Sequence, residues 1–558
     1  MARALFPHGL VPQKEAGESD SSATTRCLSG LSDGVIFEAT FETAGVSARV
    51  DILEVTPSEV RVIEIKAKSY SSLDGPDFFD KKGNLRTEWK EYIYDIAFQV
   101  FVVQLSTGRT ATPILCLVDT AKTATNNSTF DKIRLRDRGN GDKSQLSSDY
   151  VGDASQLKTD HVLAFVEVSE PVRMVMSEIE SWVEALRGVV GSNHPPHVEL
   201  STLCRSCEYR TDDTERNGFR DCWGELAKAD NHVLDLYHAS SPGTVDVVEE
   251  CIKEGRVNLV DFPVTRIDGT KARGGRQIMQ VEAATSGREL FTDSLRSALR
   301  TAKFPLHFVD FETSRIPIPY HAGMRPYEQV IFQFSVHTIE SETSESLVHR
   351  EWINSEDVYP GLEFAKELRS AIGETGTVLV WSPFEQTAMR ELAEQATRYD
   401  LGQSDLVNWL LHTRESVENG GRVLDLLKVC EKSYCHPLMG GSLSVKKVLA
   451  AVWHENSQLR DHPWFEKYKK FDSAGNLLDP YESLGVVPYG FEAEFAQVEA
   501  QVVREGVGAM RAYQEMLFGL HSSDSEFKMR TKKHLLQYCE LDTAAMVIVW
   551  KHWESIVG

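Results

Sequence analysis

The stretch Leu306–Thr313, which reads Leu-His-Phe-Val-Asp-Phe-Glu-Thr, constrains the fold more than any other part of the chain. An apolar run of this length predicts a buried β-strand, and alternate residues on a strand point to the same face. Asp310 and Glu312 therefore point into one site. Two carboxylates held together repel each other unless a proton or a cation joins them, and their hard oxygen ligands favour Mg²⁺ or Mn²⁺. A solvated acidic pair at a strand end is the alternative.

The residues that follow predict a mixed sheet flanked by helices. Strands are expected at Gln329–Thr338 and near Glu351–Trp352, then a helix at Pro360–Ile372 and a strand at Val378–Trp381. Three strands, a helix and a further strand are the order of the ribonuclease H-like fold. The second half of the chain is therefore expected to be an α/β domain of this type.

Two further acids follow this predicted sheet. Glu385 comes after Val378–Trp381, and the apolar periodicity around Tyr538 and Asp542 predicts a helix on which these two residues share a face. Four carboxylates can hold two divalent ions about 4 Å apart, one activating water and one stabilising the leaving oxygen. A helix cap for Glu385, a core position for Tyr538 and a solvated position for Asp542 are the alternatives.

This set resembles the DEDD exonucleases of the tyrosine subtype, whose last motif is Tyr-x3-Asp. The resemblance implies that Asp310, Glu312, Glu385 and Asp542 bind metal and that the Tyr538 hydroxyl positions the attacking water. It also implies removal of nucleotides from a 3′ end. One position departs from the pattern, since the second motif usually ends in Asp and here ends in glutamate.

The first third of the chain holds a second set of charged residues. Strands are expected at Val35–Phe41, Ala48–Val55 and Glu59–Ala67, and they carry Asp51, Glu64 and Lys66. An aspartate followed after twelve residues by Glu-x-Lys is the pattern of the PD-(D/E)xK nucleases. In that pattern the two acids hold a divalent ion, and the lysine orients or activates water. An exposed, charged strand end is the alternative.

The order of elements around these residues resembles the RecB-like branch of that superfamily. A helix is expected at Tyr92–Val103, carrying Gln99, and a strand at Thr112–Val118. The family's Gln-x-x-x-Tyr motif is half present, because Val103 takes the tyrosine position. The restriction-endonuclease-like fold is therefore expected here, while retained activity is a separate question.

Three cysteines, Cys204, Cys207 and Cys222, form a group after this predicted domain. Cys-x2-Cys lets one turn present two thiolates to a metal or cluster. Zinc, with His197 or His232 as a fourth ligand, fits the composition, and three unligated thiols are the further alternative. The remaining six cysteines are expected mostly in the core.

The position of the group resembles RecB-like nucleases that carry a 4Fe-4S cluster, with three cysteines after the nuclease core and one well before it. Cys27 is the upstream candidate, although it lies closer to the core than the resemblance implies. The start at Met1, inside an expected helix, suggests that a preceding piece is missing, so an incomplete cluster is among the expectations.

Four segments carry a more specific resemblance: Val309–Thr313, Arg325–His337, Met439–Val448 and Leu536–Thr543. They resemble a bacterial family known as domain of unknown function 2779, which joins a RecB-like half with a cysteine group to a DnaQ-like half. We therefore expect a RecB-like nuclease domain at 1–223, a helical connector at 224–301 and a DEDD-type domain at 302–558. Asp425 and the segment from Tyr434–His436 to Lys447 also match the family and are expected near the second site, with a solvated face as the alternative for Lys446 and Lys447.

The 558 residues carry a net charge of −23, which gives no global attraction to nucleic acid but does not exclude a nuclease that works through bound cations. No apolar run approaches the ~20 residues that span a bilayer, so a cytoplasmic protein without a membrane partner is expected. The predicted substrate is nucleic acid, single-stranded DNA ahead of RNA. The competing prediction is a nucleic-acid-binding or scaffolding protein built on nuclease folds that have lost activity.

Overall fold

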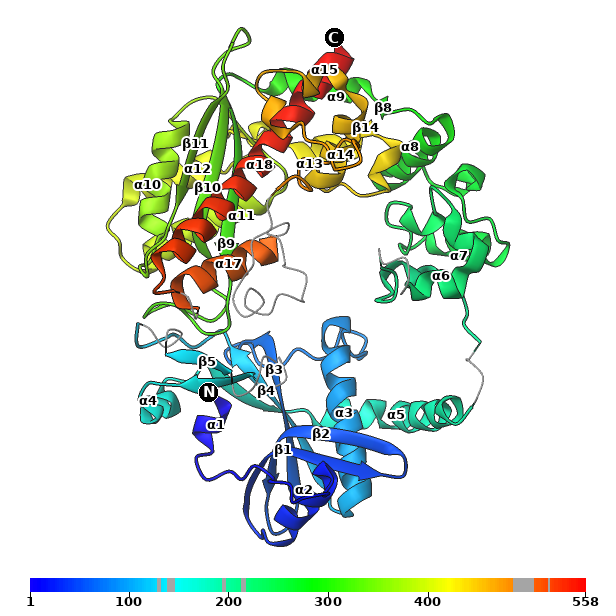
Figure 1. Cartoon of the computed structure of the whole chain (residues 1–558), viewed down its shortest axis with the longest axis vertical. Helices are drawn as coiled ribbons and strands as arrows, with labels where there is room; N and C mark the ends of the chain where they lie inside the picture. Colours follow the sequence, from blue (N-terminus) through cyan, green and yellow to red (C-terminus); the bar gives the residue numbers. More distant parts are fainter. Residues whose placement is uncertain (128–131, 138–145, 193–196, 212–216, 485–505, 520–521) are drawn as a thin grey trace. The chain divides into compact units, whose positions relative to one another are not determined.

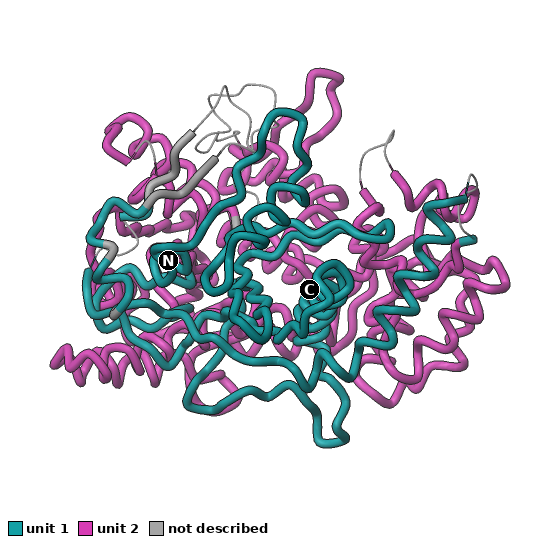
Figure 2. Tube along the Cα trace, turned by 90° about the horizontal axis from the view of Figure 1, so that it is seen from below, with its two compact units in different colours: residues 1–197, 315–328 teal, residues 198–314, 329–558 magenta. Residues whose placement is uncertain are grey.

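The computed structural model describes residues 1–558 except 128–131, 138–145, 193–196, 212–216, 485–505 and 520–521. The chain forms two compact units (Figure 2). The first comprises Met1–His197 and Arg315–Glu328, and the second comprises Val198–Ser314 and Gln329–Gly558. The group Cys204, Cys207 and Cys222 consequently belongs to the second unit. None of the helices in the described ranges is long and apolar enough to cross a membrane.

The first unit is built on a five-stranded mixed sheet in the order β1-β2-β3-β4-β7. Strands β1 to β3 are antiparallel, β3 and β4 are parallel, and β7 runs antiparallel to β4. The β1–β2 turn has positive φ at Ala44 and Gly45, the conformation that matches the twist of a tight hairpin. The strand bounds are β1 Gly34–Thr43, β2 Val46–Val55, β3 Val60–Tyr70, β4 Ala111–Asp119 and β7 Leu163–Glu167.

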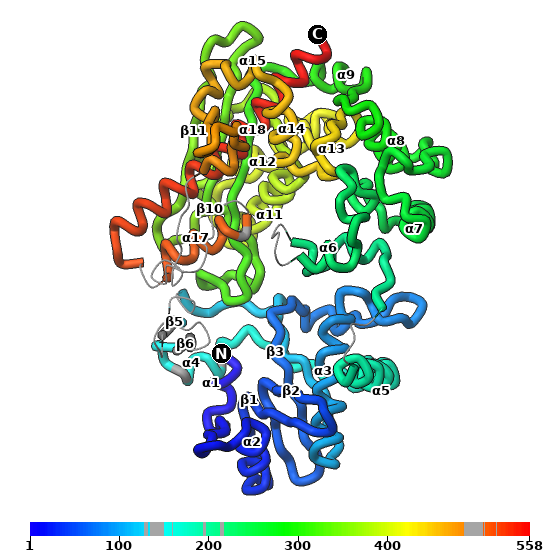
Figure 3. The backbone as a smooth tube through the Cα atoms, turned by 45° about the vertical axis from the view of Figure 1, so that its right-hand side comes forward, coloured from blue at the N-terminus to red at the C-terminus, as the bar shows by residue number. Residues whose placement is uncertain are grey.

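Helix α3 (Thr87–Thr107) packs its apolar face on this sheet and ends at Gly108, which adopts the left-handed conformation. Helix α5 (Ser169–Val190) lies beside α3 (Figure 3), where Tyr94 stacks on Trp182 with ring centroids 5.0 Å apart. The strands and the helix predicted around Asp51, Glu64 and Gln99 are thus confirmed. The other elements of this unit are α1 Ala2–Leu5, α2 Asp20–Ser29, β5 Ile133–Asp137, β6 Leu146–Tyr150 and α4 Ala154–Thr159.

The second unit contains a five-stranded mixed sheet in the order β11-β10-β9-β12-β13. Strand β9 is antiparallel to β10, which is antiparallel to β11, whereas β12 runs parallel to both β9 and β13. The predicted strands are therefore confirmed, with ends shifted by one to three residues. Their bounds are β9 Leu306–Ser314, β10 Val330–Ile339, β11 Val348–Ile353, β12 Thr377–Val380 and β13 Val423–Asp425.

Helices cover both faces of this sheet (Figure 1). On one face, Phe364 of α10 (Gly361–Ile372) packs edge-on against Phe311 and Phe334. The other face is covered by α18 (Ser525–Val557), a 33-residue helix capped by the Asp524 side chain. The remaining helices and strands after β9 are α11 Phe384–Arg398, α12 Ser404–Thr413, η7 Val417–Asn419, α13 Leu426–Ser433, β14 Tyr434–Cys435, η8 Pro437–Met439, α14 Val445–Glu455, α15 Ser457–Arg460, η9 Glu466–Tyr468 and α17 Gly506–Phe518.

The segment 224–301 is mostly helical, as predicted, and together with the residues from Val198 onward it has an apolar core around Trp223, Val248 and Leu259. It belongs to the same compact unit as the second sheet, and its strand β8 pairs with β14. The elements between Val198 and the start of β9 are η2 Thr202–Ser206, α6 Gly218–Trp223, η3 Gly224–Lys228, η4 Val233–Asp235, α7 Val245–Lys253, η5 Leu259–Asp261, η6 Val264–Arg266, α8 Ala272–Ser286, β8 Leu290–Phe291 and α9 Asp293–Thr301.

Candidate functional site

Strand β9 presents Asp310 and Glu312 on the sheet face that α18 covers. Phe311, between them, points to the opposite face and packs on Phe364. The β9–β10 register places Asp310 beside Ser335 and Glu312 beside Gln333. The strand alternation expected from the sequence therefore places both acids on one side, where Glu312 is buried.

Helix α18 brings Tyr538, Cys539 and Asp542 to the same place. The Cys539 thiol donates to Asp310 Oδ2 at 3.3 Å, and one ligand atom each from Asp310, Glu312 and Cys539 lie within 4.8 Å of one another. Asp542 accepts a hydrogen bond from the hydroxyl of Tyr481. The end of the chain thus completes a site that begins on β9.

Glu385 and Asp425 come from the part of the fold on the other side of β9, where β12 and β13 lie. Glu385 lies in the first turn of α11, directly after β12, and Asp425 pairs with Val380 at the end of β13. Each has one buried carboxylate oxygen, Glu385 Oε2 and Asp425 Oδ2, without a hydrogen-bond partner among the described residues. Asp425 Oδ1 caps α13 by accepting from the Leu427 and Lys428 amides.

The pKa values of these acids show that they share one electrostatic environment. Burial raises the pKa of Asp310 well above its ordinary value, and the charges of Asp542, Glu312 and Glu385 raise it further. Burial and then the charge of Asp542 act on the pKa of Glu312 in the same direction. Burial raises the pKa of Glu385 to about 8 and that of Asp542 to about 6. Four carboxyl groups that cannot all ionise without a cation meet here.

A lysine and two tyrosines form the wall of this acidic cluster. Lys446 Nζ, on α14, lies 5.2 Å from the ring centroids of both Tyr481 and Tyr538, a favourable cation–π geometry. Its charge opposes the rise in the pKa values of Glu312 and Asp542. Burial, with the neighbouring carboxylates, raises the pKa of Tyr538, so this hydroxyl stays protonated.

The donor set fits hard divalent cations. Asp310, Glu312, Glu385 and Asp542 offer carboxylate oxygens, and Glu385 has a buried oxygen that lacks a protein partner within the described ranges. Oxygen-only ligands of this kind suit Mg²⁺ and Mn²⁺. Cys539 adds a soft sulfur atom at the edge of the set.

In the first unit, Asp51 and Glu64 stand across from each other on β2 and β3, in the register set by Ile52 and Ile63. Asp51 Oδ2 accepts the Ile65 amide at 2.9 Å. Burial raises the pKa values of both carboxyl groups. The two acids of the sequence pattern are therefore brought together.

Lys66 and Gln99 both contact the Glu64 carboxylate. Lys66 Nζ lies 2.9 Å from Glu64 Oε1 and 2.5 Å from Asp95 Oδ2, while Gln99 Nε2 donates to Glu64 Oε2 at 2.8 Å. Burial alone would lower the pKa of Lys66, but the hydrogen bonds to Asp95 and Glu64 raise it overall. Val103 is buried in the core of the sheet and α3.

The three cysteines predicted to bind a metal or a cluster lie in the helical segment of the second unit. Cys204 and Cys207 are partly buried at η2, and Cys222 is exposed on α6. Within the residues placed by the structure, the groups of three or more ligand atoms within 4.8 Å of one another contain none of these cysteines. The 4Fe-4S cluster and the zinc alternative stay predictions from the cysteine spacing, and no step of the chemistry is derived through them.

The candidate partners of the cysteines are placed as follows. His232 is buried beside Trp223, its Nδ1 accepts the Leu234 amide at 3.1 Å, and burial lowers its pKa to about 4. Cys27 and His197 belong to the first unit, where Cys27 packs against the core. Five of the six remaining cysteines are buried, as predicted, and Cys27 is partly buried.

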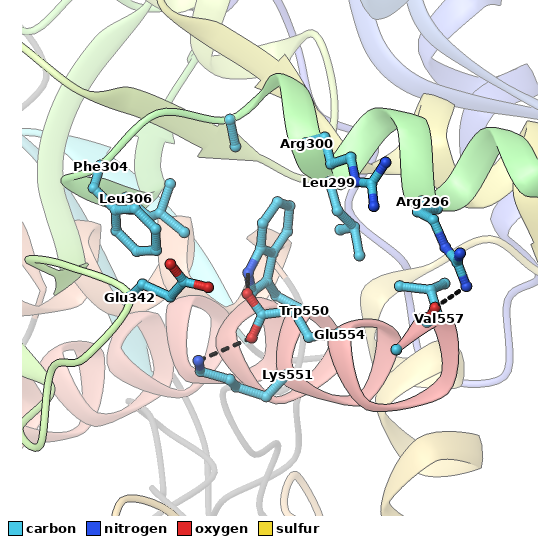
Figure 4. Close-up of a pocket in the computed structure, with 12 residues that line it drawn as sticks. Arg296, Leu299, Arg300, Phe304, Leu306, Glu342, Trp550, Lys551, Glu554 and Val557 are labelled. Atoms are coloured by element: carbon cyan, nitrogen blue, oxygen red, sulfur yellow. Dashed lines mark hydrogen bonds and ion pairs between the residues drawn. The ribbon is translucent and has the colours of Figure 1, made fainter.

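A cavity of about 470 Å³ lies elsewhere in the second unit (Figure 4). It is bounded by α9, the start of β9 and the last turns of α18, with Arg296, Arg300 and Trp550 on its wall. Lys551 in this wall is paired with Glu554 at 2.9 Å. None of the candidate acids lines the cavity, so the carboxylate cluster is a separate feature.

Comparison with known proteins gives one match. Residues 307–444 match the model of a domain of unknown function, DUF2779, which supports placing this α/β segment in that family. The matched segment holds Asp310, Glu312 and Glu385 and ends before Lys446. No curated protein and no solved structure gave a significant match.

Sequence reasoning missed two residues that contact the predicted ones. Tyr481 reaches Asp542 from an irregular segment in which no periodicity indicates a direction. Asp95 pairs with Lys66 and lies one helical turn before Gln99. The i, i+4 spacing of Asp95 and Gln99 was the available signal, because such residues share a helix face.

Proposed function

We propose that this protein is a metal-dependent nuclease that hydrolyses phosphodiester bonds, with a ribonuclease H-like DEDD exonuclease in the second unit. The observation that carries the proposal is the convergence of Asp310, Glu312, Glu385 and Asp542 from β9, α11 and α18 into one buried cluster with raised pKa values. Structural acids are normally paired with cations or hydrogen-bond donors, whereas carboxylates left to repel one another suit a metal site.

Bound divalent ions would lower the pKa of the attacking water and stabilise the leaving oxygen. The four carboxylates would hold these ions. The Tyr538 hydroxyl, kept protonated by its surroundings, would orient the water by a hydrogen bond. Lys446 would keep a positive charge beside Glu312 and Asp542, where the phosphate charge develops.

In the first unit we propose a RecB-like PD-(D/E)xK site. Asp51 and Glu64 would hold a divalent ion, Lys66 would orient the water, and Gln99 fixes the Glu64 carboxylate. One observation favours a binding role without catalysis for this unit: Val103 occupies the family's tyrosine position and is buried in the core. The cysteine group is proposed as a 4Fe-4S site on its spacing alone, and iron and sulfide analysis tests it.

The deciding experiment is Mn²⁺-dependent degradation of end-labelled single-stranded DNA and RNA by the full chain. Asp310→Asn and Glu312→Gln keep the size of each side chain and are expected to abolish a 3′ ladder while sparing binding. Glu363→Gln, at an exposed position on α10, is the matched control. We expect DNA to be degraded ahead of RNA.

If Asp310→Asn still produces the 3′ ladder, the second unit is not the source of that activity. Lys66→Ala then separates the contribution of the first unit, because it leaves the second cluster intact. Binding of both polymers without any degradation by the wild type would favour the nucleic-acid-binding alternative.

A further inference from the structure

Three metal-ligand side chains meet at a second place on the α18 face of the second sheet. One ligand atom each from His337 on β10, His349 on β11 and Glu540 on α18 lie within 4.8 Å of one another. The two imidazoles are cross-strand neighbours, stacked with ring centroids 4.5 Å apart. Neither histidine belongs to the carboxylate cluster, and the proposed nuclease chemistry uses none of the three.

Two hydroxyl groups already orient the imidazole rings. His337 Nδ1 lies 2.7 Å from Thr543 Oγ1, and His349 Nε2 lies 3.0 Å from Ser335 Oγ. These two hydroxyls are themselves 2.9 Å apart. A ligating histidine normally has one nitrogen held by a polar partner, which fixes the ring and leaves the other nitrogen for the metal.

Two charged groups beside the histidines bear on metal binding. One is a further carboxylate, and the other is a lysine that competes with a metal ion for Glu540. Glu351 lies two residues after His349 on the same face of β11, and the charge of Glu540 raises its pKa after burial does, so a second carboxylate stands beside the group. Lys467 forms an ion pair with Glu540, and its side chain is 54% exposed, so it can swing into solvent. Burial lowers the pKa values of both histidines, and the charge of Lys467 acts in the same direction, whereas that of Glu540 opposes the fall at His349.

We propose that His337, His349 and Glu540 form a zinc-binding site, with Glu351 as the fourth ligand, that fastens the β10–β11 hairpin to α18. Two neutral imidazoles and two carboxylates suit a tetrahedral zinc ion with bonds of about 2.0–2.1 Å. Glu540 lies two residues before Asp542 on the same helix. Zinc here would hold the turn of α18 that carries Tyr538 and Asp542.

The test counts tightly bound zinc on the full-length protein. The chain is stripped with a chelator, reloaded with Zn²⁺, passed through a desalting column and analysed for metal. We expect His349→Gln to bind one equivalent less than the wild type. His412→Gln is the matched control, because His412 is exposed on α12 and outside the group. Co²⁺ supplies a second readout, since a tetrahedral site gives an intense visible ligand-field band that His349→Gln would lose.

Equal zinc content in the wild type and in folded His349→Gln would overturn the proposal. If circular dichroism shows that His349→Gln is unfolded, Glu540→Gln decides in the same way, because it keeps the side-chain size. The proposal does not rest on the nuclease activity. A lower zinc content of His349→Gln would support the zinc site even if the wild type degraded neither DNA nor RNA.

Discussion

The thiol of Cys539 donates a hydrogen bond to Asp310 Oδ2, with 3.3 Å between sulfur and oxygen. This bond lowers the pKa of Asp310, whereas burial and the neighbouring carboxylates raise it. Because a metal ion must displace the proton from Asp310, the thiol favours the state that binds metal.

The first prediction concerns this bond. Cys539→Val replaces the sulfur by two methyl groups and removes the donor, so the pKa of Asp310 rises and protons compete better with metal. A net hydrogen bond of about 0.5–1.5 kcal/mol corresponds to a roughly two- to tenfold higher Mn²⁺ concentration for half-maximal activity near neutral pH. Cys539→Ser retains a donor and should stay near the wild type. Equal Mn²⁺ dependence of Cys539→Val and the wild type would show that the thiol only fills space.

The second prediction is the pH dependence of stability without metal. Glu385 has its pKa raised from 4.5 to about 8, so between these values the folded chain binds more protons than the unfolded chain. Stability therefore falls as the pH rises through this window and is highest at its acidic end. Thermal unfolding in a chelator, measured from about pH 5 to about pH 8, should show a falling Tm.

Two controls belong to that measurement. Glu385→Gln cannot ionise and should flatten the fall, whereas Glu363→Gln, on the surface of α10, should not. Adding Mn²⁺ at the alkaline end should raise the Tm of the wild type, because the ion binds only the folded state. A Tm of Glu385→Gln with the wild-type slope would contradict the prediction.

Local pattern was enough to predict the strands that carry the acids. β9 is an apolar run whose alternation alone places Asp310 and Glu312 on one face, and the i, i+4 spacing of Tyr538 and Asp542 predicts their shared helix face. The same reasoning was sufficient for β2, β3 and α3, which carry Asp51, Glu64 and Gln99. In each case the sequence pattern that decides the direction of the side chains lies within one element.

Contacts made by distant or irregular segments were not predictable in this way. Tyr481 reaches Asp542 across 61 residues from a loop, and nothing in its neighbours indicates that its hydroxyl is needed there. Cys539 was expected in the core, and it is buried, but its bond to Asp310 depends on how α18 crosses β9. The cross-strand pairing of His337 with His349 depends on the β10–β11 register.

The third prediction concerns the ion pairs of Lys66. Its side chain is 25% exposed and that of Glu64 is 10% exposed, so water screens their attraction only partly. Lys66→Met leaves the largely buried Glu64 carboxylate without its cation and should lower the free energy of unfolding of the first unit by about 1–3 kcal/mol. Glu64→Gln together with Lys66→Met should recover part of this loss, since only the more exposed carboxylate of Asp95 then stays without its cation.

Hydrogen exchange of the β3 and α3 amides in urea measures this unit without interference from the second. The matched control is Lys68→Met, two residues further along β3. Lys68 Nζ lies over the rings of Trp89 and Tyr92 at 5.3 and 5.7 Å, so its contacts differ in kind from the ion pairs of Lys66. Equal losses in Lys66→Met and Lys68→Met would argue against the buried pair.

The fourth prediction tests how the helical segment after Val198 is held to the second sheet. Gly440 and Gly441 both have positive φ, at 55° and 73°, but a Cβ on Gly441 would lie 1.9 Å from the carbonyl oxygen of Asp235, whereas one on Gly440 meets nothing within 4 Å. Gly440→Ala should therefore lose only the backbone term of about 1–2 kcal/mol. Gly441→Ala adds a backbone clash that no rotamer relieves, so its loss in the free energy of unfolding should be clearly larger. Urea denaturation of both variants measures the difference, and equal losses would mean that η4, which ends at Asp235, moves away at little cost.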